Sequence, residues 1–293
     1  MGTGSEYERY EEPYSHEVRD RRVRGARGLQ AVDGLTTSAV FDDAAERYVA
    51  GDINARQLSD MVDDYYNQKV ERGINRYSQE ADLVSARICD ALDSNGFTFS
   101  PATLRAIHGR LFRGLMEEPF YEQHYRDYNI SKREFVLARE SVAYGDYASL
   151  EDDLETAFSE FSPAPAQDGD YTAYIASVAD FIARVWQIHP FAEGNTRTVA
   201  VFLQQLLHFH GFPQDCSEAF DRSSLQFRNA LVRANYRNNE AGILPERKPL
   251  EAFYENLLLG AEHALNREAL LCPELFDNPQ LLKHIDPSRA LRR

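Results

Sequence analysis

The chain has 293 residues, 43% of them hydrophobic, and its 47 acidic and 32 basic residues give a net charge of −15. This balance argues against broad nucleic-acid binding, which depends on many Lys and Arg contacts to phosphate. No run approaches the ~18 uninterrupted apolar residues of a membrane-spanning helix, and the polar, acidic segment Met1 to Pro13 is no secretory signal. The three cysteines (positions 89, 216 and 272) lack metal-binding spacing, so we expect a cytoplasmic protein, with a secreted effector as the alternative.

The N-terminal part of the chain predicts a leader and three short helical segments. Residues 1–16 combine Glu and Tyr with little apolar periodicity and predict a mobile leader. Five arginines follow, at positions 19, 21, 22, 24 and 27; they fit a nucleic-acid patch or the solvated face of a helix, and the acidic chain favours the second. We expect this helix to end at Asp33, with Gly34 at the C′ position, before helices over residues 40–50 and 55–69.

Two amphipathic helices are predicted next, over residues 77–91 and 101–115. Ser100 and Pro101 read as the N-cap and the first-turn proline of the second helix. His108 lies on or beside the apolar stripe of that helix, which favours a core or boundary histidine over a catalytic one.

Residues 125–130 break the helical period, and the plausible strand pair follows as residues 134–137 and 141–144. The pattern therefore predicts one short β-hairpin in a helical chain. Arg126, just before it, could hold a phosphate or form a surface salt bridge.

The segment between residues 189 and 197 joins two further helical patterns. Apolar residues recur at positions 175, 178, 179, 182, 185 and 186, and Pro190 ends that helix at His189. A second apolar face begins at position 199, so the loop lies at a helix N-terminus, where unpaired N–H groups and the helix dipole favour an anion. We expect Pro190 and Phe191 to shape this loop.

The polar residues of the loop match the needs of phosphate chemistry. His189 can accept a proton near neutral pH, given an ordinary pKa near ~6.5. Glu193 is a hard oxygen ligand for Mg²⁺, Gly194 lets backbone approach a phosphate, and Asn195 and Arg197 can donate to charged oxygens. The alternative is an ordinary interhelical loop beside a core histidine; five functional residue types in one loop favour a site.

The stretch HPFAEGNTR, residues 189–197, resembles the signature of the Fic family, HPFx(D/E)GNGRxxR. The resemblance covers residues 75–265 and implies an all-α fold, a Fic-type helical bundle with one short β-hairpin flap. It implies transfer of AMP from ATP to a hydroxyl of another protein, with His189 as general base. It also implies Mg²⁺ on Glu193 and phosphates on the segment from Gly194 to Arg197.

Two positions depart from that signature. Thr196 replaces a glycine; it keeps its backbone N–H, and its hydroxyl could cap the following helix. Ala200 replaces a second arginine, a cation that the family uses on the terminal phosphate and in regulation.

The segment ending in Asp33 and Gly34 resembles the antitoxin-like module that some Fic proteins carry or bind. Its inhibitory helix has the pattern (S/T)xxxE(G/N), which Leu29, Asp33 and Gly34 match in part, and its Glu pairs with the second arginine, here Ala200. Because both halves of that pair are altered, we expect the module to inhibit weakly or through another contact. The alternative is that these helices merely complete the core.

The resemblance also assigns roles outside the motif. The hairpin corresponds to the family's flap, which can take up a target peptide by strand addition; its side chains here are those of Phe135, Val136, Val142 and Tyr144. Asn235 and Tyr236 lie where the family often contacts the base.

The sequence thus divides into a leader (1–16), an antitoxin-like module (17–70), a Fic catalytic domain (71–266) and a tail (267–293). The expected partners are target proteins and the chain's own inhibitory helix, and a homo-oligomer is left open, as is a role as toxin, effector or regulator. Two other functions compete with AMP transfer. One is phosphorylation with the nucleotide reversed, as in Doc-like kinases, which carry Lys where Thr196 stands; the other is a catalytically weak helical interaction protein.

Overall fold

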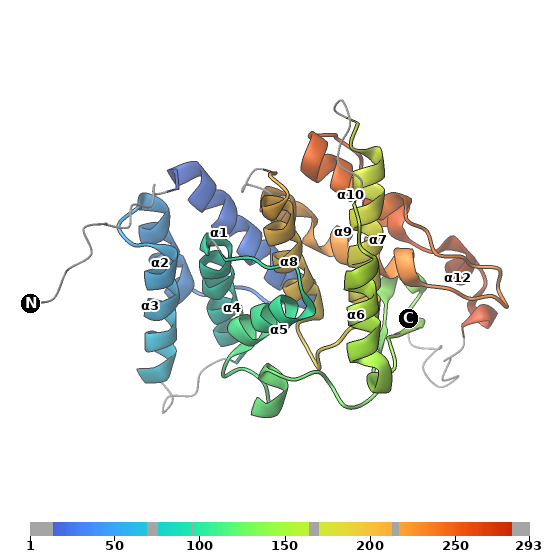
Figure 1. Cartoon of the computed structure of the whole chain (residues 1–293), viewed down its shortest axis with the longest axis horizontal. Helices are drawn as coiled ribbons and strands as arrows, with labels where there is room; N and C mark the ends of the chain where they lie inside the picture. Colours follow the sequence, from blue (N-terminus) through green and yellow to red (C-terminus); the bar gives the residue numbers. More distant parts are fainter. Residues whose placement is uncertain (1–13, 69–75, 95, 164–169, 213–216, 283–293) are drawn as a thin grey trace, which may run out of the picture.

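The computed structural model describes residues 14–68, 76–94, 96–163, 170–212 and 217–282. Within these ranges, twelve α-helices and one two-stranded antiparallel hairpin form the fold, which confirms the predicted all-α class. The molecule extends from α2 (Ala39–Ala50) and α3 (Ala55–Gln68) at one end to α12 (Pro273–Asp277) at the other (Figure 1). Most of the predicted leader and the end of the predicted tail lie outside the described residues. None of the described helices has the length and apolar character that crossing a bilayer requires.

The N-terminal helices α1–α3 precede a body of seven helices and two short C-terminal ones. The remaining helices are α1 (His16–Gln30), α4 (Arg76–Asp93), α5 (Pro101–Phe112), α6 (Leu150–Glu160), α7 (Thr172–Ile188), α8 (Asn195–Phe209), α9 (Glu218–Asn235), α10 (Lys248–Leu259) and α11 (Arg267–Leu270). Short 3₁₀ turns are η1 (Ala31–Asp33), η2 (Pro119–Glu122), η3 (Phe135–Leu137), η4 (Tyr147–Ser149) and η5 (Pro279–Leu281).

Helices α7 and α8 form the centre of the core and position the motif loop between them. Their predicted apolar faces are confirmed, because Val178, Ile182 and Val185 of α7 are fully buried, as are Phe202 and Leu206 of α8. Helix α8 packs against α4, α5 and α7 and carries buried residues along nearly its whole length. Such a surrounded helix is a rigid support for a loop at its N-terminus.

Helix α1 packs closely on α9 through two glycines. A Cβ atom at Gly25 would lie 2.5 Å from the carbonyl oxygen of Ser217, and one at Gly28 would lie 2.1 Å from that of Phe220. Glycine lowers helix stability by about 1 kcal/mol relative to alanine. These two residues therefore weaken α1 locally but allow close contact between the helices. That contact holds the end of α1 next to the motif loop.

The arginines of α1 are packed against neighbouring elements, which corrects both readings of the arginine run. Arg19 is 8% exposed and donates to the carbonyl oxygen of Tyr48 at 3.0 Å. Arg22 is 1% exposed and pairs with Asp93 of α4 at 2.7 Å, and Arg24 reaches a carboxylate of α9 at 3.0 Å. The sequence shows how these arginines are spaced along the helix, but their carboxylate and carbonyl partners lie on segments distant in sequence.

The hairpin consists of β1 (Ser131–Arg133) and β2 (Ser141–Ala143), with Lys132 opposite Val142. A hairpin is confirmed, but the predicted first strand is wrong, since residues 135–137 form η3 instead. Val136 and Leu137 are both fully buried within that turn, so these neighbouring side chains do not alternate between faces as they would in a strand.

The short C-terminal helices cover the turn of this hairpin. The backbone N–H of Cys272 donates to the carbonyl oxygen of Val136 at 2.8 Å. The guanidinium of Arg267 lies 3.8 Å from the centroid of the Phe135 ring. Residues of the predicted tail therefore support the flap, and the division of the chain into domains stays a proposal.

Candidate active site

The motif loop runs from His189 to Gly194 and contains two residues with positive φ. Helix α7 ends at Ile188, and His189 takes φ 52° and ψ 60°, a left-handed conformation that few non-glycine residues adopt. Gly194 has φ 76°, and a Cβ atom there would lie 2.2 Å from the Phe112 ring. Glycine is therefore required at position 194 by both conformation and space, in addition to the predicted approach to a phosphate.

The imidazole of His189 is buried and has a defined tautomer. Its Nδ1 lies 2.9 Å from the carbonyl oxygen of Trp186; because a carbonyl only accepts, Nδ1 carries the proton and Nε2 the lone pair. The Tyr144 ring stacks on the imidazole, with centroids 3.7 Å apart. Burial lowers the pKa of His189 to about 3, with positive neighbours including Lys132 adding to the effect. The ordinary pKa assumed from the sequence is thus corrected.

Arg126 holds the backbone around His189. Its guanidinium donates to the carbonyl oxygens of His189 at 2.8 Å, Tyr128 at 2.6 Å and Ile188 at 3.2 Å, and also to that of Gly145. Arg126 is 2% exposed, so it is neither the phosphate ligand nor the surface ion pair considered from the sequence. It is a structural clamp that stabilises the strained His189 conformation.

His108 supports the loop from behind, and the predicted core assignment is confirmed. It is fully buried on α5, whose N-cap Ser100 is also as predicted. The imidazole stacks on Phe191, with centroids 3.9 Å apart, and Nε2 lies 3.1 Å from the carbonyl oxygen of Glu193. Burial lowers the pKa of His108 to about 4, against the opposite effect of its contacts with the carbonyl oxygens of Glu122 and Glu193.

Two polar residues of the motif have their side chains bonded within the protein. The amide of Asn195 donates to the carbonyl oxygen of Phe191 at 2.8 Å and accepts from the Phe191 N–H at 3.0 Å. The Thr196 hydroxyl accepts from the indole N–H of Trp186 at 3.0 Å and makes no capping bond with α8. The proposed cap by Thr196 is therefore corrected, and the donors left for an anion are the backbone N–H groups of the first helical turn.

Glu193 is exposed on the loop and has one oxygen engaged locally. Its Oε1 accepts from the Gly194 N–H at 2.9 Å. The side chain borders a cavity of about 340 Å³, which Glu80, Phe112, Tyr121 and Tyr128 also line. An exposed carboxylate fits Mg²⁺, which proteins hold through one or two carboxylates plus substrate phosphates. Among the described residues, no three His, Cys, Asp or Glu side chains group to hold a metal by themselves.

Arg197 is the most heavily paired residue of the motif. It is 1% exposed, and its Nη1 donates to Gln30 Oε1 at 3.0 Å. Its Nη2 lies 2.8 Å from Glu80 Oε1, and its Nε lies 3.2 Å from Asp33 Oδ2 without the alignment of a hydrogen bond. The N-terminal helices and α4 thus place two carboxylates and an amide on this guanidinium.

The partner expected for Asp33 is corrected by these contacts. Ala200 is fully buried in the core, so Asp33 faces Arg197, and it also reaches Lys132 of β1 with Nζ 3.6 Å from Oδ1. Gly34 takes the left-handed φ of 72° predicted for a C′ glycine, although η1 separates it from the end of α1. Gln30, Glu80 and Lys132 were missed from the sequence, where each is an ordinary polar residue of a helix or strand.

The predicted flap side chains have different environments. Val136 and Val142 belong to the core, at 0% and 3% exposure, and cannot offer side chains to a target. Phe135 is 46% exposed, and Tyr144 covers His189. The exposed strand is β1, so main-chain docking on its free side stays a prediction.

Asn235 and Tyr236 lie at the end of α9. The Asn235 amide nitrogen donates to the carbonyl oxygens of Ala183 at 3.0 Å and Leu231 at 2.9 Å, and Tyr236 is 6% exposed. One amide bond of Asn235 thus connects α9 to α7, and the other lies within α9. Contact of this pair with a base stays a prediction.

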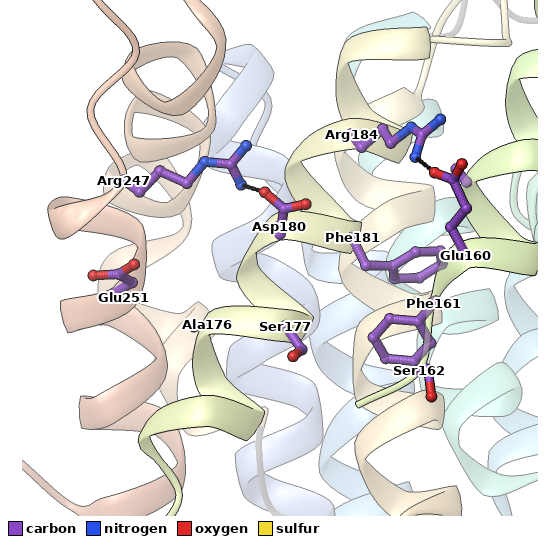
Figure 2. Close-up of a pocket in the computed structure, with 11 residues that line it drawn as sticks. Glu160, Phe161, Ser162, Ala176, Ser177, Asp180, Phe181, Arg184, Arg247 and Glu251 are labelled. Carbon is purple, nitrogen blue, oxygen red and sulfur yellow. Dashed lines mark hydrogen bonds and ion pairs between the residues drawn. The ribbon is translucent and has the colours of Figure 1, made fainter. Parts of the chain in front are cut away.

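A second hollow, of about 550 Å³, lies between α6, α7 and α10 and contains none of the motif residues. Figure 2 shows two ion pairs across it, Arg247 with Asp180 and Arg184 with Glu160. We assign it no part in the candidate active site.

Comparison with known proteins defines the class of both parts of the chain. Residues 98–207 match the model of the Fic/DOC family, and residues 19–63 match the model of antitoxin VbhA. A Fic family protein from Desulfovibrio desulfuricans G20 has a similar structure, with a TM-score of 0.54 and 17% sequence identity over 92% of this chain and 68% of that chain. At this identity the likeness supports the fold alone. No curated protein matches the chain.

The chain therefore carries a Fic/DOC-family domain that follows an antitoxin VbhA domain. The general chemistry that this family supports is the transfer of nucleotidyl or phosphoryl groups from a nucleotide.

Proposed function

We propose that this protein transfers AMP from Mg·ATP to a Ser, Thr or Tyr hydroxyl of a target protein and releases pyrophosphate. The observation that carries this proposal is the neutral His189 imidazole, whose Nδ1 is committed to Trp186, beside the N-terminus of α8 and Arg197. The acceptor hydroxyl gives its proton to Nε2 while its oxygen attacks the α-phosphate and the bond to the leaving pyrophosphate breaks.

The low pKa of His189 is compatible with this role once a nucleotide binds. Positive charges around the ring, from Lys132, Arg126 and Arg228, favour the neutral form. A bound triphosphate brings negative charge to the same region, so it raises the pKa and makes the imidazole a stronger base. A bound nucleotide thus strengthens the base at the moment it is needed.

Phosphate binding would rest on the backbone N–H groups of the first turn of α8 and on the guanidinium of Arg197. Glu193 would hold Mg²⁺, which would offset charge on the departing phosphates. Asn195 positions the loop through its bonds to Phe191.

Asp33 of the antitoxin domain, together with Glu80 of α4, restrains this site by neutralising Arg197. Asp33, Glu80 and Gln30 surround the guanidinium, so nucleotide phosphates must compete with them for it. Both carboxylates also repel phosphate directly. This contact replaces the pairing with position 200, which Ala200 cannot make.

The direct test is intact-mass spectrometry of the full chain and of candidate target proteins after incubation with Mg·ATP. We expect addition of one AMP group, which should be lost in His189→Ala and enhanced in Asp33→Asn. Asp43→Asn, at an exposed position of α2, is the matched control for the second variant. Addition of single phosphate groups would instead identify a kinase with reversed nucleotide. No modification together with no calorimetric binding of ATP to Asp33→Asn would refute the proposal.

A further inference from the structure

The carboxylate of Asp33 lies between two cations from different parts of the fold. Its Oδ2 lies 3.2 Å from Nε of Arg197 at the start of α8, and its Oδ1 lies 3.6 Å from Nζ of Lys132 in β1. One anionic group therefore bridges the flap and the phosphate-binding end of α8. The two cations define a position where negative charge is stabilised from both sides.

This second cation does not come from α8, where the Fic signature would place it. Ala200 lies one turn after Arg197 and is fully buried in the core, so position 200 offers no charge to the site. Asp33 on the antitoxin domain nevertheless has two positive neighbours, Arg197 and Lys132. Lys132 is the one that comes from outside the motif.

Lys132 is also more available for a ligand than the other positive groups beside His189. Arg126 is committed to four backbone carbonyls, and the 9% exposed Arg228 is committed to the buried carboxylate of Glu134. The side chain of Lys132 is 48% exposed, and its ion-pair contact within the described residues is the one to Asp33. A lysine held by one movable carboxylate can exchange it for another anion.

The charge of Lys132 also influences the pKa of His189. After burial, the charge of Lys132 is the largest electrostatic influence that lowers the pKa of this imidazole. Lys132 is therefore close enough to the proposed general base to act on it electrostatically.

We propose that Lys132 is a nucleotide-binding residue of the flap, which holds a phosphate oxygen together with Arg197 and supplies the cation that position 200 lacks. The inference rests on the proposed function, and it adds a residue that the motif does not contain. When Asp33 withdraws, the phosphate chain takes its place between the two cations. Nucleotide binding then links β1 to the N-terminal end of α8 in place of Asp33, next to the strand edge that would receive a target peptide.

The test is isothermal titration calorimetry of Mg·ATP and of adenosine with the full chain carrying Asp33→Asn. We compare Asp33→Asn alone with its combinations with Lys132→Met, Lys132→Arg and Arg133→Met. Arg133 is exposed and adjacent on β1, where successive side chains point to opposite faces, so it is the matched control.

Loss of one charge-assisted contact predicts about tenfold weaker ATP binding in Asp33→Asn/Lys132→Met. Adenosine binding should be unchanged, Lys132→Arg should retain most of the affinity, and Arg133→Met should match its parent. The effect of Lys132→Met should also shrink as salt is raised, because the side chain is half-exposed.

Different outcomes separate this inference from the proposed function. If Asp33→Asn binds ATP and Lys132→Met leaves that affinity unaltered, the role of Lys132 is refuted while AMP transfer stands. Equal weakening of ATP and adenosine would indicate a merely structural role and would also overturn the inference. If Asp33→Asn binds no ATP at all, both the inference and the proposed function fail.

Discussion

At the residue scale, the candidate active site depends on side chains whose conformation and pKa are set by burial. His189 is left-handed, stacked and neutral because Arg126, Tyr144 and Trp186 enclose it. The motif predicts His189 as the base. Its pKa could not be predicted from the motif, because desolvation depends on which side chains cover the ring.

Arg126→Gln tests the clamp on the His189 backbone. The variant leaves several buried carbonyl oxygens without their donor, so we expect a loss of about 3 kcal/mol in the free energy of unfolding. We expect the activation free energy of the transfer reaction to rise by more than this amount. Equilibrium unfolding in urea measures the first effect. Arg133→Gln on exposed β1 is the control, and equal stability of the two variants would refute the clamp.

The depressed pKa of His189 predicts a pH dependence of stability. The unfolded chain takes up a proton at this residue near pH 6.5, but the folded protein does so only near pH 3, so stability is lost as pH falls through this window. Between pH 8 and pH 5 the loss from this one group is about 2 kcal/mol. In His189→Gln, the difference in the free energy of unfolding between pH 8 and pH 5, measured in urea, should shrink by this amount. His16→Gln, at an exposed position, is the control. An unchanged pH profile in His189→Gln would contradict the assignment.

At the scale of elements, local patterns predicted the helices better than the hairpin. The faces of α7 and α8 follow a period of 3.6, and the caps at Ser100 and Gly34 are local. The apolar and aromatic character of Phe135–Leu137 predicts a strand. The segment forms a buried turn because α11 and α12 cover it, a contact that no local pattern encodes.

The close contact of α1 with α9 gives a prediction opposite to helix propensity. Gly28→Ala should favour an isolated helix by about 1 kcal/mol, but its Cβ would meet the Phe220 carbonyl at 2.1 Å. We expect a net loss of about 2 kcal/mol, measured by thermal unfolding. Gln30 and Asp33 follow Gly28 on the same segment, so a displaced α1 should weaken their contacts with Arg197. The variant should therefore also bind Mg·ATP more tightly.

Gly96→Ala is the control for that variant, since a Cβ atom there would meet open space. A gain in stability for Gly28→Ala would show that α1 and α9 are less closely packed than described.

At the scale of the whole molecule, the two domains are coupled through Arg197. The guanidinium is nearly buried, and its partners come from α1, η1 and α4. The same carboxylate that restrains Arg197 also reaches the flap through Lys132. Under the proposed function, nucleotide binding and docking of the antitoxin domain are therefore linked equilibria.

Removing the carboxylates should strengthen ATP binding at the expense of stability. We expect about fivefold tighter binding of Mg·ATP in Asp33→Asn and about thirtyfold in Asp33→Asn/Glu80→Gln, from partly exposed ion pairs of ~1 kcal/mol each. The double variant should also unfold at lower temperature, since Arg197 stays buried without a counter-charge. Asp43→Asn is the control. Unchanged ATP affinity in the double variant, measured by calorimetry, would rule out the restraint.

The sequence by itself determined the helical class and the central helix pair, and it predicts the chemistry of the loop from His189 to Arg197. These follow from local periodicity, capping and residue type, which act over a few neighbouring positions. Only the tertiary structure decided that Arg197 is held by Gln30, Asp33 and Glu80, that Lys132 faces the same anion, and that His189 is neutral. Those properties depend on ion pairs and desolvation between segments far apart in sequence, which form only when the helices pack.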